Sequence, residues 1–268
     1  MTKAIDTGAG GRMGGRIITL INSTEGIEVV GAVEVKGHAV LGKDIGECLG
    51  LGKKNVVVVD SLDKCIEKGD VIIDFTHHEA SLRHLGEAAR KQKAIVIGST
   101  GFSAEGMAKA KELSKEARCV LAPNMSVGVN VMFKVLDIVT GILGDDYDVE
   151  IVEAHHHLKK DAPSGTAMKM AQIIAAQLGR DLDKVGIYER KGMIGERTKT
   201  EIGIQTLRAG DIVGEHTVLY GAVGERLEFI HRAHSRDNFA KGAIRAAKWI
   251  VNQKNGFYDM QDVLGLRD

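Results

Sequence analysis

The segment from Glu153 to Thr166 gathers side chains that could bind an anion and transfer a proton. Its sequence is Glu-Ala-His-His-His-Leu-Lys-Lys-Asp-Ala-Pro-Ser-Gly-Thr. Imidazole groups titrate near neutral pH, so the three adjacent histidines are candidates for proton transfer. The Pro-Ser-Gly-Thr turn precedes a helix-forming stretch, whose first N–H groups and positive dipole end favour a carboxylate or phosphate. The segment predicts a site that holds an anionic substrate and protonates it.

A metal site and a serine nucleophile are alternative interpretations of this segment, and we favour neither. Side chains alternate along a strand, so His155 and His157 would share a face without an evident third ligand. Ser164 lacks a Gly-x-Ser-x-Gly elbow and suits the position of a helix cap. We therefore expect no bound metal.

A glycine-rich segment, Gly8-Ala9-Gly10-Gly11-Arg12-Met13-Gly14-Gly15, follows the first predicted strand and precedes a predicted helix. Glycines let the backbone turn tightly and approach a pyrophosphate, although the spacing reads GxxGxxG and a plain glycine-rich turn is the alternative. Glu34 ends the second predicted strand about twenty residues later, where a carboxylate can accept hydrogen bonds from ribose hydroxyls. These features predict a dinucleotide site.

The choice between the two nicotinamide dinucleotides rests on a few charges. Glu34 favours the free ribose hydroxyl of NADH, whereas Arg12 and Lys36 could neutralise the 2′-phosphate of NADPH. We expect NADH, NADPH or both, with NADH slightly favoured. Asp6 lies inside the first predicted strand, where a buried carboxylate needs a partner or a raised pKa.

Strands alternate with helices in the first half of the chain. Six strands rich in valine and isoleucine are predicted over residues 3–7, 27–34, 56–59, 71–75, 94–97 and 119–122. This alternation predicts an α/β, doubly wound parallel sheet. Longer strands follow over residues 148–154, 201–208, 214–220 and 225–233, with a helix at 165–178 among them, and they predict a second α+β domain with an antiparallel or mixed sheet. A final helix over residues 238–252 could return to the first domain.

Composition excludes several classes of protein. The chain has 36 basic and 36 acidic side chains, so no overall field favours nucleic acid or an anionic membrane. We find no apolar run of about twenty residues and no cleavable leader, which predicts a cytoplasmic protein. Cys48, Cys65 and Cys119 are odd in number and widely spaced, which favours reduced thiols.

Several motifs occur in a fixed order along essentially the whole chain. They are Gly-Ala-Gly-Gly-Arg-Met-Gly at 8–14, Asp-Phe-Thr at 74–76, Gly-Ser-Thr-Gly-Phe at 98–102, Ala-Pro-Asn-Met-Ser-Val-Gly at 122–128, the 153–166 segment, Arg-Ala-Gly-Asp-Ile-Val-Gly-Glu-His at 208–216, and Ser-Arg at 235–236. The combination resembles the dihydrodipicolinate reductase family, also described as 4-hydroxy-tetrahydrodipicolinate reductases. The 153–166 segment is the most specific of these motifs.

The resemblance implies an architecture and an activity. The expected domains are a Rossmann-type dinucleotide-binding domain of residues 1–126 and 236–268, and a substrate-binding and oligomerisation domain of residues 127–235. The expected assembly is a homotetramer built through the open sheets. The expected reaction is the NAD(P)H-dependent reduction of 4-hydroxy-tetrahydrodipicolinate, a small dicarboxylate, to tetrahydrodipicolinate in lysine and diaminopimelate biosynthesis.

The resemblance also implies roles for individual residues. The catalytic pair is His155 and Lys159. The substrate contacts are His156, Lys159, Gly165 and Thr166. The dinucleotide contacts, with the loop glycines included, are Gly8, Gly11, Arg12, Met13, Gly14, Glu34, Phe75, Thr76, Gly98, Thr100, Ala122 and Met125. Val35 stands where better-known members place an arginine that can meet the 2′-phosphate, which weakens any strict preference for NADPH.

The reaction chemistry supports the same roles. Reduction of an unsaturated cyclic imine needs a hydride at one carbon and a proton at its neighbour. Lys159 is the expected acid, because cations packed around it would ease proton release, and His155 would share or relay that proton. Two rival functions remain: a dehydrogenase of another small amino or keto acid, and a non-catalytic dinucleotide sensor. A sensor would not need the proton donor.

Overall fold

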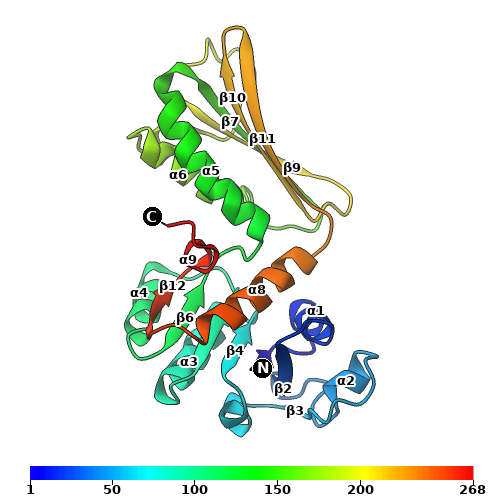
Figure 1. The fold of residues 1–268 in the computed structure, drawn as a ribbon. Coiled ribbons are helices and arrows are strands. Elements are labelled where there is room, and N and C mark those ends of the chain that lie inside the picture. Colours follow the sequence, from blue (N-terminus) through cyan, green and yellow to red (C-terminus); the bar gives the residue numbers. More distant parts are fainter. Residues whose placement is uncertain (268) are drawn as a thin grey trace. The chain divides into compact units, whose positions relative to one another are not determined.

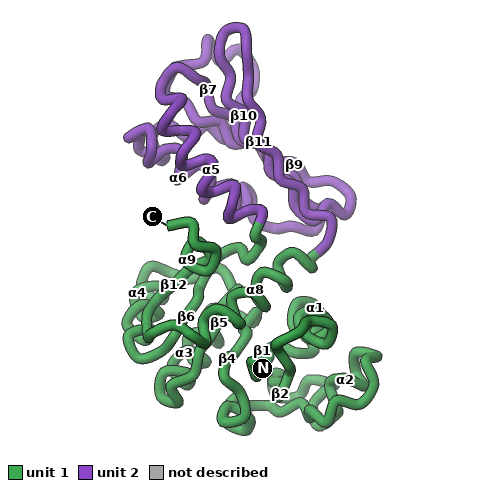
Figure 2. The backbone as a smooth tube through the Cα atoms, viewed as in Figure 1, with its two compact units in different colours: residues 1–127, 236–268 green, residues 128–235 purple. Residues whose placement is uncertain are grey.

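The computed structural model describes residues 1–267, which form two compact units. The first unit consists of Met1–Val127 and Arg236–Asp268, and the second is Gly128–Ser235 (Figure 2). The second unit is therefore inserted into the sequence of the first, and the chain crosses between them twice.

The first unit is built on a seven-stranded sheet in which all neighbouring strands are parallel. Its strands are β1 (Thr2–Thr7), β2 (Ile27–Val33), β3 (Val58–Val59), β4 (Val71–Asp74), β5 (Ala94–Ile97), β6 (Arg118–Leu121) and β12 (Gly256–Tyr258). Their spatial order is β12-β6-β5-β4-β1-β2-β3, so the order reverses between β4 and β1. This confirms the predicted doubly wound sheet, whose ligand crevice lies at such a reversal.

Helices cover both faces of this sheet (Figure 1). They are α1 (Arg12–Ile21), α2 (Ile45–Cys48), α3 (His78–Arg90), α4 (Ala104–Leu113), α8 (Asp237–Ile250) and α9 (Met260–Leu264), with the short 3₁₀ turns η1 (Leu62–Lys64) and η2 (Ile66–Lys68). Alternate residues of β4 face opposite layers: Val71 and Ile73 pack with α1 and α8, whereas Ile72 packs with α3. Helix α8, which corresponds to the helix predicted over residues 238–252, does belong to the first unit.

The second unit contains a five-stranded mixed sheet of order β11-β10-β7-β9-β8. Its strands are β7 (Asp148–His155), β8 (Gly186–Ile187), β9 (Ile202–Arg208), β10 (Gly214–Ala222) and β11 (Glu225–Ala233). The pairs β11/β10 and β10/β7 are antiparallel, whereas β7/β9 and β9/β8 are parallel. The helices are α5 (Val127–Leu143), α6 (Gly165–Gln177), α7 (Leu182–Val185) and the 3₁₀ turn η3 (Gly144–Asp146). This sheet confirms the predicted mixed α+β architecture.

One helix of the second unit is more apolar than the others. The stretch Val127–Asp146 is long and apolar enough to cross a membrane by length and composition, with a mean hydropathy of 1.6. In the structure, Val129, Phe133 and Leu136 of α5 are buried in the same hydrophobic cluster as residues of β7, β9 and α6. The test is weak evidence for a membrane span, because a helix that packs in a protein core passes it as well.

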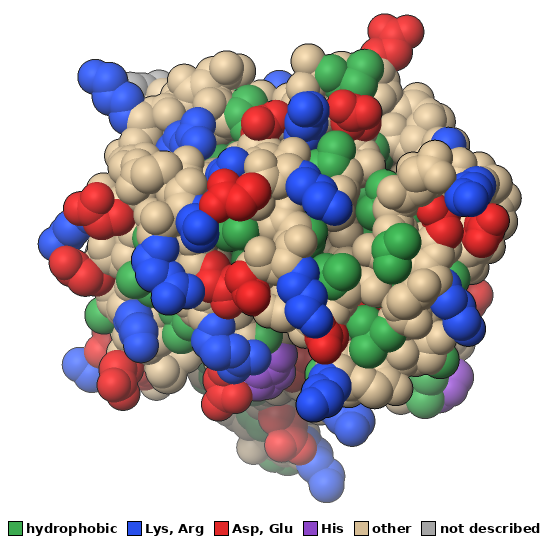
Figure 3. All heavy atoms as spheres, turned by 90° about the horizontal axis from the view of Figure 1, so that it is seen from below, with side chains coloured by type: hydrophobic (Ala, Val, Ile, Leu, Met, Phe, Trp, Pro, Cys, Tyr) green, Lys and Arg blue, Asp and Glu red, His purple; other side chains and the backbone are tan. Residues whose placement is uncertain are grey.

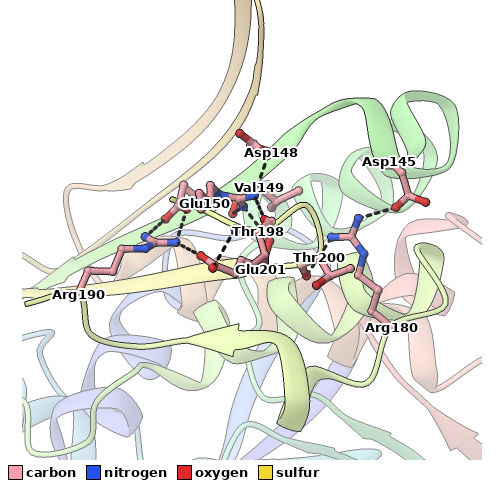
Figure 4. Close-up of polar contacts among 10 residues, drawn as sticks. Asp145, Asp148, Val149, Glu150, Arg180, Arg190, Thr198, Thr200 and Glu201 are labelled. Carbon is pink, nitrogen blue, oxygen red and sulfur yellow. Dashed lines mark hydrogen bonds and ion pairs between the residues drawn. The ribbon is translucent and has the colours of Figure 1, made fainter. Parts of the chain in front are cut away.

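The segment between β8 and β9 is anchored to β7 and β9 by two arginines (Figure 4). Arg190 donates two hydrogen bonds to the Glu150 carboxylate at 2.8 and 2.9 Å and one to Glu201 at 3.1 Å. Arg197 donates to the backbone carbonyls of Val149 and Glu201. The bidentate pair of Arg190 and Glu150 fixes the relative orientation of the two side chains and also pairs their charges.

Surface charge and thiols follow the composition. Basic and acidic side chains are interspersed on the face shown in Figure 3, as the balanced composition leads one to expect. The thiols of Cys48, Cys65 and Cys119 are free. Burial raises the pKa of Cys65 to about 11 and that of Cys119 to about 12, which keeps both thiols protonated and unreactive.

Candidate active site

The carboxylate of Glu153 is the centre of a buried polar cluster at the end of β7. The residue is fully buried and accepts hydrogen bonds from His155 Nδ1 at 2.5 Å and from both terminal nitrogens of Arg208 at 2.8 and 2.9 Å. It also accepts the backbone N–H of Ser164 at 2.9 Å. Burial alone would raise the pKa of Glu153, but the hydrogen bonds from His155, Arg208 and Ser164 lower it to about 2. Glu153 is therefore an ionised carboxylate at neutral pH.

This cluster holds His155 in one orientation. The bond from Nδ1 to an acceptor-only carboxylate places a proton on Nδ1, and the other ring nitrogen, Nε2, lies 3.1 Å from the position a Cβ would take on Gly214. A glycine at position 214 thus leaves room for the ring. No role was predicted for Glu153, Arg208 and Gly214, although all three stand in the motifs at 153–166 and 208–216.

Lys159 lies in the loop after β7, and its environment differs from the prediction. Its Nζ is 2.8 Å from both carboxylate oxygens of Asp161, so the ammonium is paired with an anion that the prediction did not include. Although partial burial would raise it, the hydrogen bonds from Lys159 lower the pKa of Asp161. The lysine side chain is 20% exposed.

Backbone hydrogen bonds connect the three histidines to the turn between β9 and β10. His155 accepts the N–H of Ala209 at 2.9 Å, and the N–H of His156 donates to Ile212 at 2.7 Å. His157 donates to Gly210 through its own N–H at 3.2 Å, and its Nδ1 lies 2.8 Å from the same carbonyl. The motif at 208–216 therefore supports the histidine run rather than forming a separate site.

The start of α6 is shaped by Ser164 and a histidine that the sequence analysis left without a role. Ser164 Oγ accepts the N–H of Ala167 at 3.2 Å, which confirms it as the helix cap, and lies 3.0 Å from His216 Nε2. Burial, followed by repulsion from His155, lowers the pKa of His216 to about 3, so this ring is neutral. Gly165 begins the helix, and a Cβ there would meet nothing within 4 Å. A ligand can approach the helix start at this position.

The residues predicted to contact a dinucleotide all follow carboxyl ends of strands in the first unit. Gly8 follows β1, Glu34 follows β2, Phe75 and Thr76 follow β4, and further residues follow β5 and β6, namely Gly98, Thr100, Ala122 and Met125. The side chains of Ala122 and Met125 are buried in the core, whereas Thr100 is exposed. The parallel sheet thus brings the predicted residues to one edge.

The glycine-rich loop fits a pyrophosphate. Gly8 has φ +81°, and a Cβ on Gly14 would lie 2.2 Å from the carbonyl oxygen of Gly8. The loop therefore needs glycine at both positions. Gly11 caps α1 without a side-chain hydrogen bond, and no acidic residue lies in the first turn of that helix. No side chain caps the N–H groups at this helix start. These groups can therefore donate hydrogen bonds to an anion.

Glu34 is turned toward this loop. Its Oε1 accepts the N–H of Gly10 at 3.0 Å and its Oε2 accepts the N–H of Val35 at 2.8 Å. The carboxylate is therefore held beside the loop, where a ribose would lie. The side chain of Val35 is 70% exposed and carries no charge. Arg12 begins α1 and is exposed.

Asp6 is a buried carboxyl without a partner. It is 1% exposed, and neither oxygen has a hydrogen-bond partner among residues 1–267. Burial, with the nearby charges of Asp74 and Glu34, raises the pKa of Asp6 well above its usual value. Of the two options that the sequence analysis allowed, a partner or a raised pKa, the structure shows the second.

Comparison with known proteins places the whole chain in one family. Residues 2–125 match the family model of the dihydrodipicolinate reductase N-terminus, and residues 128–264 match that of the C-terminus. The chain is 68% identical over 267 residues to 4-hydroxy-tetrahydrodipicolinate reductase of Syntrophus aciditrophicus and 58% identical to that of Geotalea uraniireducens, with 100% of each chain covered.

The fold has a solved counterpart. A dipicolinate-bound dihydrodipicolinate reductase from Paenisporosarcina sp. TG-14 superposes with a TM-score of 0.77 at 24% identity, covering 98% of both chains. The resemblance seen in the sequence motifs is thus confirmed. The chain belongs to the dihydrodipicolinate reductase family and is an NAD(P)H-dependent oxidoreductase.

Proposed function

We propose that this chain reduces 4-hydroxy-tetrahydrodipicolinate to tetrahydrodipicolinate, a step of lysine and diaminopimelate biosynthesis. The observation that carries this proposal is the Glu153 cluster, which joins an oriented histidine to the start of α6 within a chain 68% identical to a named reductase. A dicarboxylate substrate suits this arrangement, because the helix start favours one carboxylate and Lys159 can reach another.

The overall reaction balances with one hydride and one proton entering the substrate and one molecule of water leaving it. The bound nicotinamide dinucleotide supplies the hydride. The chain itself must supply the proton and hold the ring still during the transfer. Among residues 153–166, only the histidines and lysines carry protons suited to this task.

Lys159 is the proton donor in this proposal, and His155 assists it. The ammonium of Lys159 is held by Asp161 at 2.8 Å in the absence of a substrate, and a substrate carboxylate would compete with Asp161 for it. His155 is oriented by Glu153, so its Nε2 edge is free to share or relay the proton. His156, Lys159, Gly165 and Thr166 hold the substrate carboxylates.

The dinucleotide contacts are proposed on the first unit. Gly8, Gly11 and Gly14 lie against the pyrophosphate, and Glu34 accepts hydrogen bonds from the adenine ribose. The remaining proposed contacts are Arg12, Met13, Phe75, Thr76, Gly98, Thr100, Ala122 and Met125. NADH is slightly favoured over NADPH, because Glu34 faces the ribose position while uncharged Val35 offers nothing to a 2′-phosphate.

The domain roles and the assembly follow the same proposal. Residues 1–126 and 236–268 bind the dinucleotide, and residues 127–235 bind the substrate and form the oligomer. We propose a cytoplasmic homotetramer assembled through the five-stranded sheets. Leu207 on β9 and Ile230 on β11 are exposed apolar side chains on the same face of this sheet, and they support an interface there.

Steady-state kinetics on enzymatically generated substrate test the activity and the cofactor preference together. We expect turnover with both cofactors and a modestly higher kcat/KM with NADH. Assays with aspartate semialdehyde and simple keto acids separate the proposal from a dehydrogenase of another small acid. Activity on those compounds but not on the dihydrodipicolinate-derived substrate would contradict the proposal, as would cofactor binding without any turnover.

A further inference from the structure

Buried polar side chains connect the two loops that follow β4 and β5. Asp74, the last residue of β4, is fully buried, and its Oδ1 accepts hydrogen bonds from the Thr76 N–H at 3.0 Å and the Thr76 hydroxyl at 2.7 Å. The same oxygen accepts the hydroxyl of Ser81 in α3 at 2.8 Å. The Ser81 hydroxyl in turn lies 2.6 Å from that of Ser99, which follows β5. Asp74 is thus linked to both loops.

The direction of each hydrogen bond follows from the charge on Asp74. Burial would raise the pKa of Asp74, but His84 Nδ1 at 2.5 Å and the Thr76 groups outweigh burial and lower it. The ionised carboxylate can only accept, so Ser81 donates its one proton to Asp74 and must accept the proton of Ser99. A one-way chain therefore runs from Ser99 through Ser81 to Asp74.

Close packing fixes the same loops to each other. A Cβ on Gly98 would lie 2.3 Å from the ring of Phe75, and a Cβ on Gly8 would lie 3.2 Å from the Thr76 methyl. The loops after β1, β4 and β5 are therefore in mutual contact. They lie where the strand order reverses between β4 and β1, the place at which a doubly wound sheet binds its ligand.

We propose that Ser81 is a positioning residue of the dinucleotide site. Through its hydrogen bonds to Asp74 and Ser99, it keeps the loop 75–77 in register with the loop 98–100. Ser81 is fully buried, so it would act on the site through these hydrogen bonds and not by contact with a ligand. This inference rests on the proposed function, in which Phe75, Thr76 and Gly98 are dinucleotide contacts. We place Phe75 and Thr76, with the adjoining loop of Gly98, at the nicotinamide half of the cofactor, and the glycine loop and Glu34 at the adenine half.

Ligand titrations of Ser81→Ala test the proposal. We expect the Kd for NADH, measured by fluorescence, to rise about tenfold, because loss of one buried hydrogen-bond link is on the order of a tenfold change in equilibrium. The Kd for ADP, which has no nicotinamide half, should stay within about twofold of the wild-type value. Ser99→Ala removes the same Ser81–Ser99 hydrogen bond and should change the two Kd values in the same way. This second variant keeps the test valid if Ser81→Ala folds poorly.

Ser114→Ala is the matched control. Ser114 is equally buried, but its hydroxyl donates to Ala110 in the same helix at 2.7 Å and takes no part in the link. This variant should lose stability without a change in the NADH Kd. The proposal is overturned if Ser81→Ala and Ser99→Ala bind NADH as the wild type does, or if they weaken ADP as much as NADH. Wild-type protein that binds neither ligand would refute the cofactor site of the proposed function itself.

Discussion

Glu153 Oε1 accepts the backbone N–H of Ser164 across eleven residues of sequence, at 2.9 Å. The other oxygen of this carboxylate accepts His155 Nδ1 at 2.5 Å. One buried side chain thus ties the proposed proton-transfer group to the helix start proposed to hold the substrate. A change at Glu153 should therefore affect both halves of the substrate site together.

Glu153→Gln should reduce both stability and turnover. The neutral amide removes the ion pair with Arg208, and its nitrogen cannot accept a hydrogen bond from that partly buried guanidinium. The folded-state pKa of about 2, against 4.5 for the free side chain, corresponds to about 3 kcal/mol of unfolding free energy at neutral pH. Because this folded pKa is depressed, the contribution is present above pH 4.5 and is lost as the pH falls toward 2.

Urea unfolding across an acidic pH range measures this effect. The difference in unfolding free energy between the wild type and Glu153→Gln should stay constant from pH 6 to about 5 and then shrink as the pH is lowered to 3, by about 1.4 kcal/mol per pH unit at most. A difference that does not vary with pH would show that folding leaves the pKa of Glu153 unchanged, and a difference that grows at low pH would show that folding raises it.

Lys159→Ala should lower turnover by orders of magnitude with little change in NADH affinity, because the variant lacks the proposed proton donor. Lys160→Ala is the matched control, since Lys160 is the exposed neighbour to which we give no role. Pre-steady-state and steady-state rates, with NADH Kd measured in parallel, separate the two effects. Equal turnover in both variants would refute the role of Lys159.

Asp6→Val should stabilise the protein. The substitution removes a buried carboxyl whose oxygens have no partner in the described chain, which is worth roughly 2 kcal/mol. The folded pKa of Asp6 is raised, so the native state keeps its proton longer than the unfolded state, and wild-type stability declines as the pH rises above 3.8. The gain from Asp6→Val should therefore grow with pH in urea unfolding between pH 4 and 9. A gain that is constant over this range would contradict a raised pKa.

Val35→Arg should shift the cofactor preference toward NADPH. An exposed guanidinium next to Glu34 can pair with the 2′-phosphate, and a charge-assisted pair of this kind is worth about tenfold in relative kcat/KM. Val223→Arg, at a fully exposed valine in the β10–β11 turn, controls for the added charge. Unchanged preference in Val35→Arg would show that residue 35 does not face the 2′ position.

Gly203→Ala should destabilise the second unit. A Cβ at this position would lie 1.8 Å from Glu150 Oε2, so the carboxylate would have to leave Arg190 (Figure 4). We expect a loss of about 2 kcal/mol in thermal unfolding. Gly221→Ala in β10 is the control, because its Cβ would meet only Leu219 at 3.4 Å. Similar losses of unfolding free energy in both variants would show that the effect comes from replacing any strand glycine and not from the contact with Glu150.

Alternation of strands and helices was enough to predict the sheet of the first unit. The predicted strands at 3–7, 71–75 and 94–97 agree with β1, β4 and β5 to within one residue at each end. Buried parallel strands read as continuous apolar runs, and those runs are visible in the sequence. β12 was missed because Gly-Phe-Tyr is short and its strand character comes from pairing with β6.

The 153–166 segment does form a polar cluster in the structure, but the residues that support it were not predicted. Glu153 was quoted only as the first letter of a motif, and its role depends on Arg208, which lies 55 residues away. The environment of Lys159 was predicted from neighbouring sequence charges, whereas the folded loop turns Asp161 toward it. Long-range pairing and loop geometry decide such contacts, and local sequence carries little information about either.

The double crossing between the units determines the order in which the protein can be completed during synthesis. The first unit takes its last helix and its edge strand from residues that are translated after the entire second unit, and β6 has β12 as its outer neighbour. While the second unit is being synthesised, the seven-stranded sheet of the first unit still lacks its edge strand β12, and helix α8 is also missing. The first unit therefore cannot complete its fold until α8 and β12 have been synthesised.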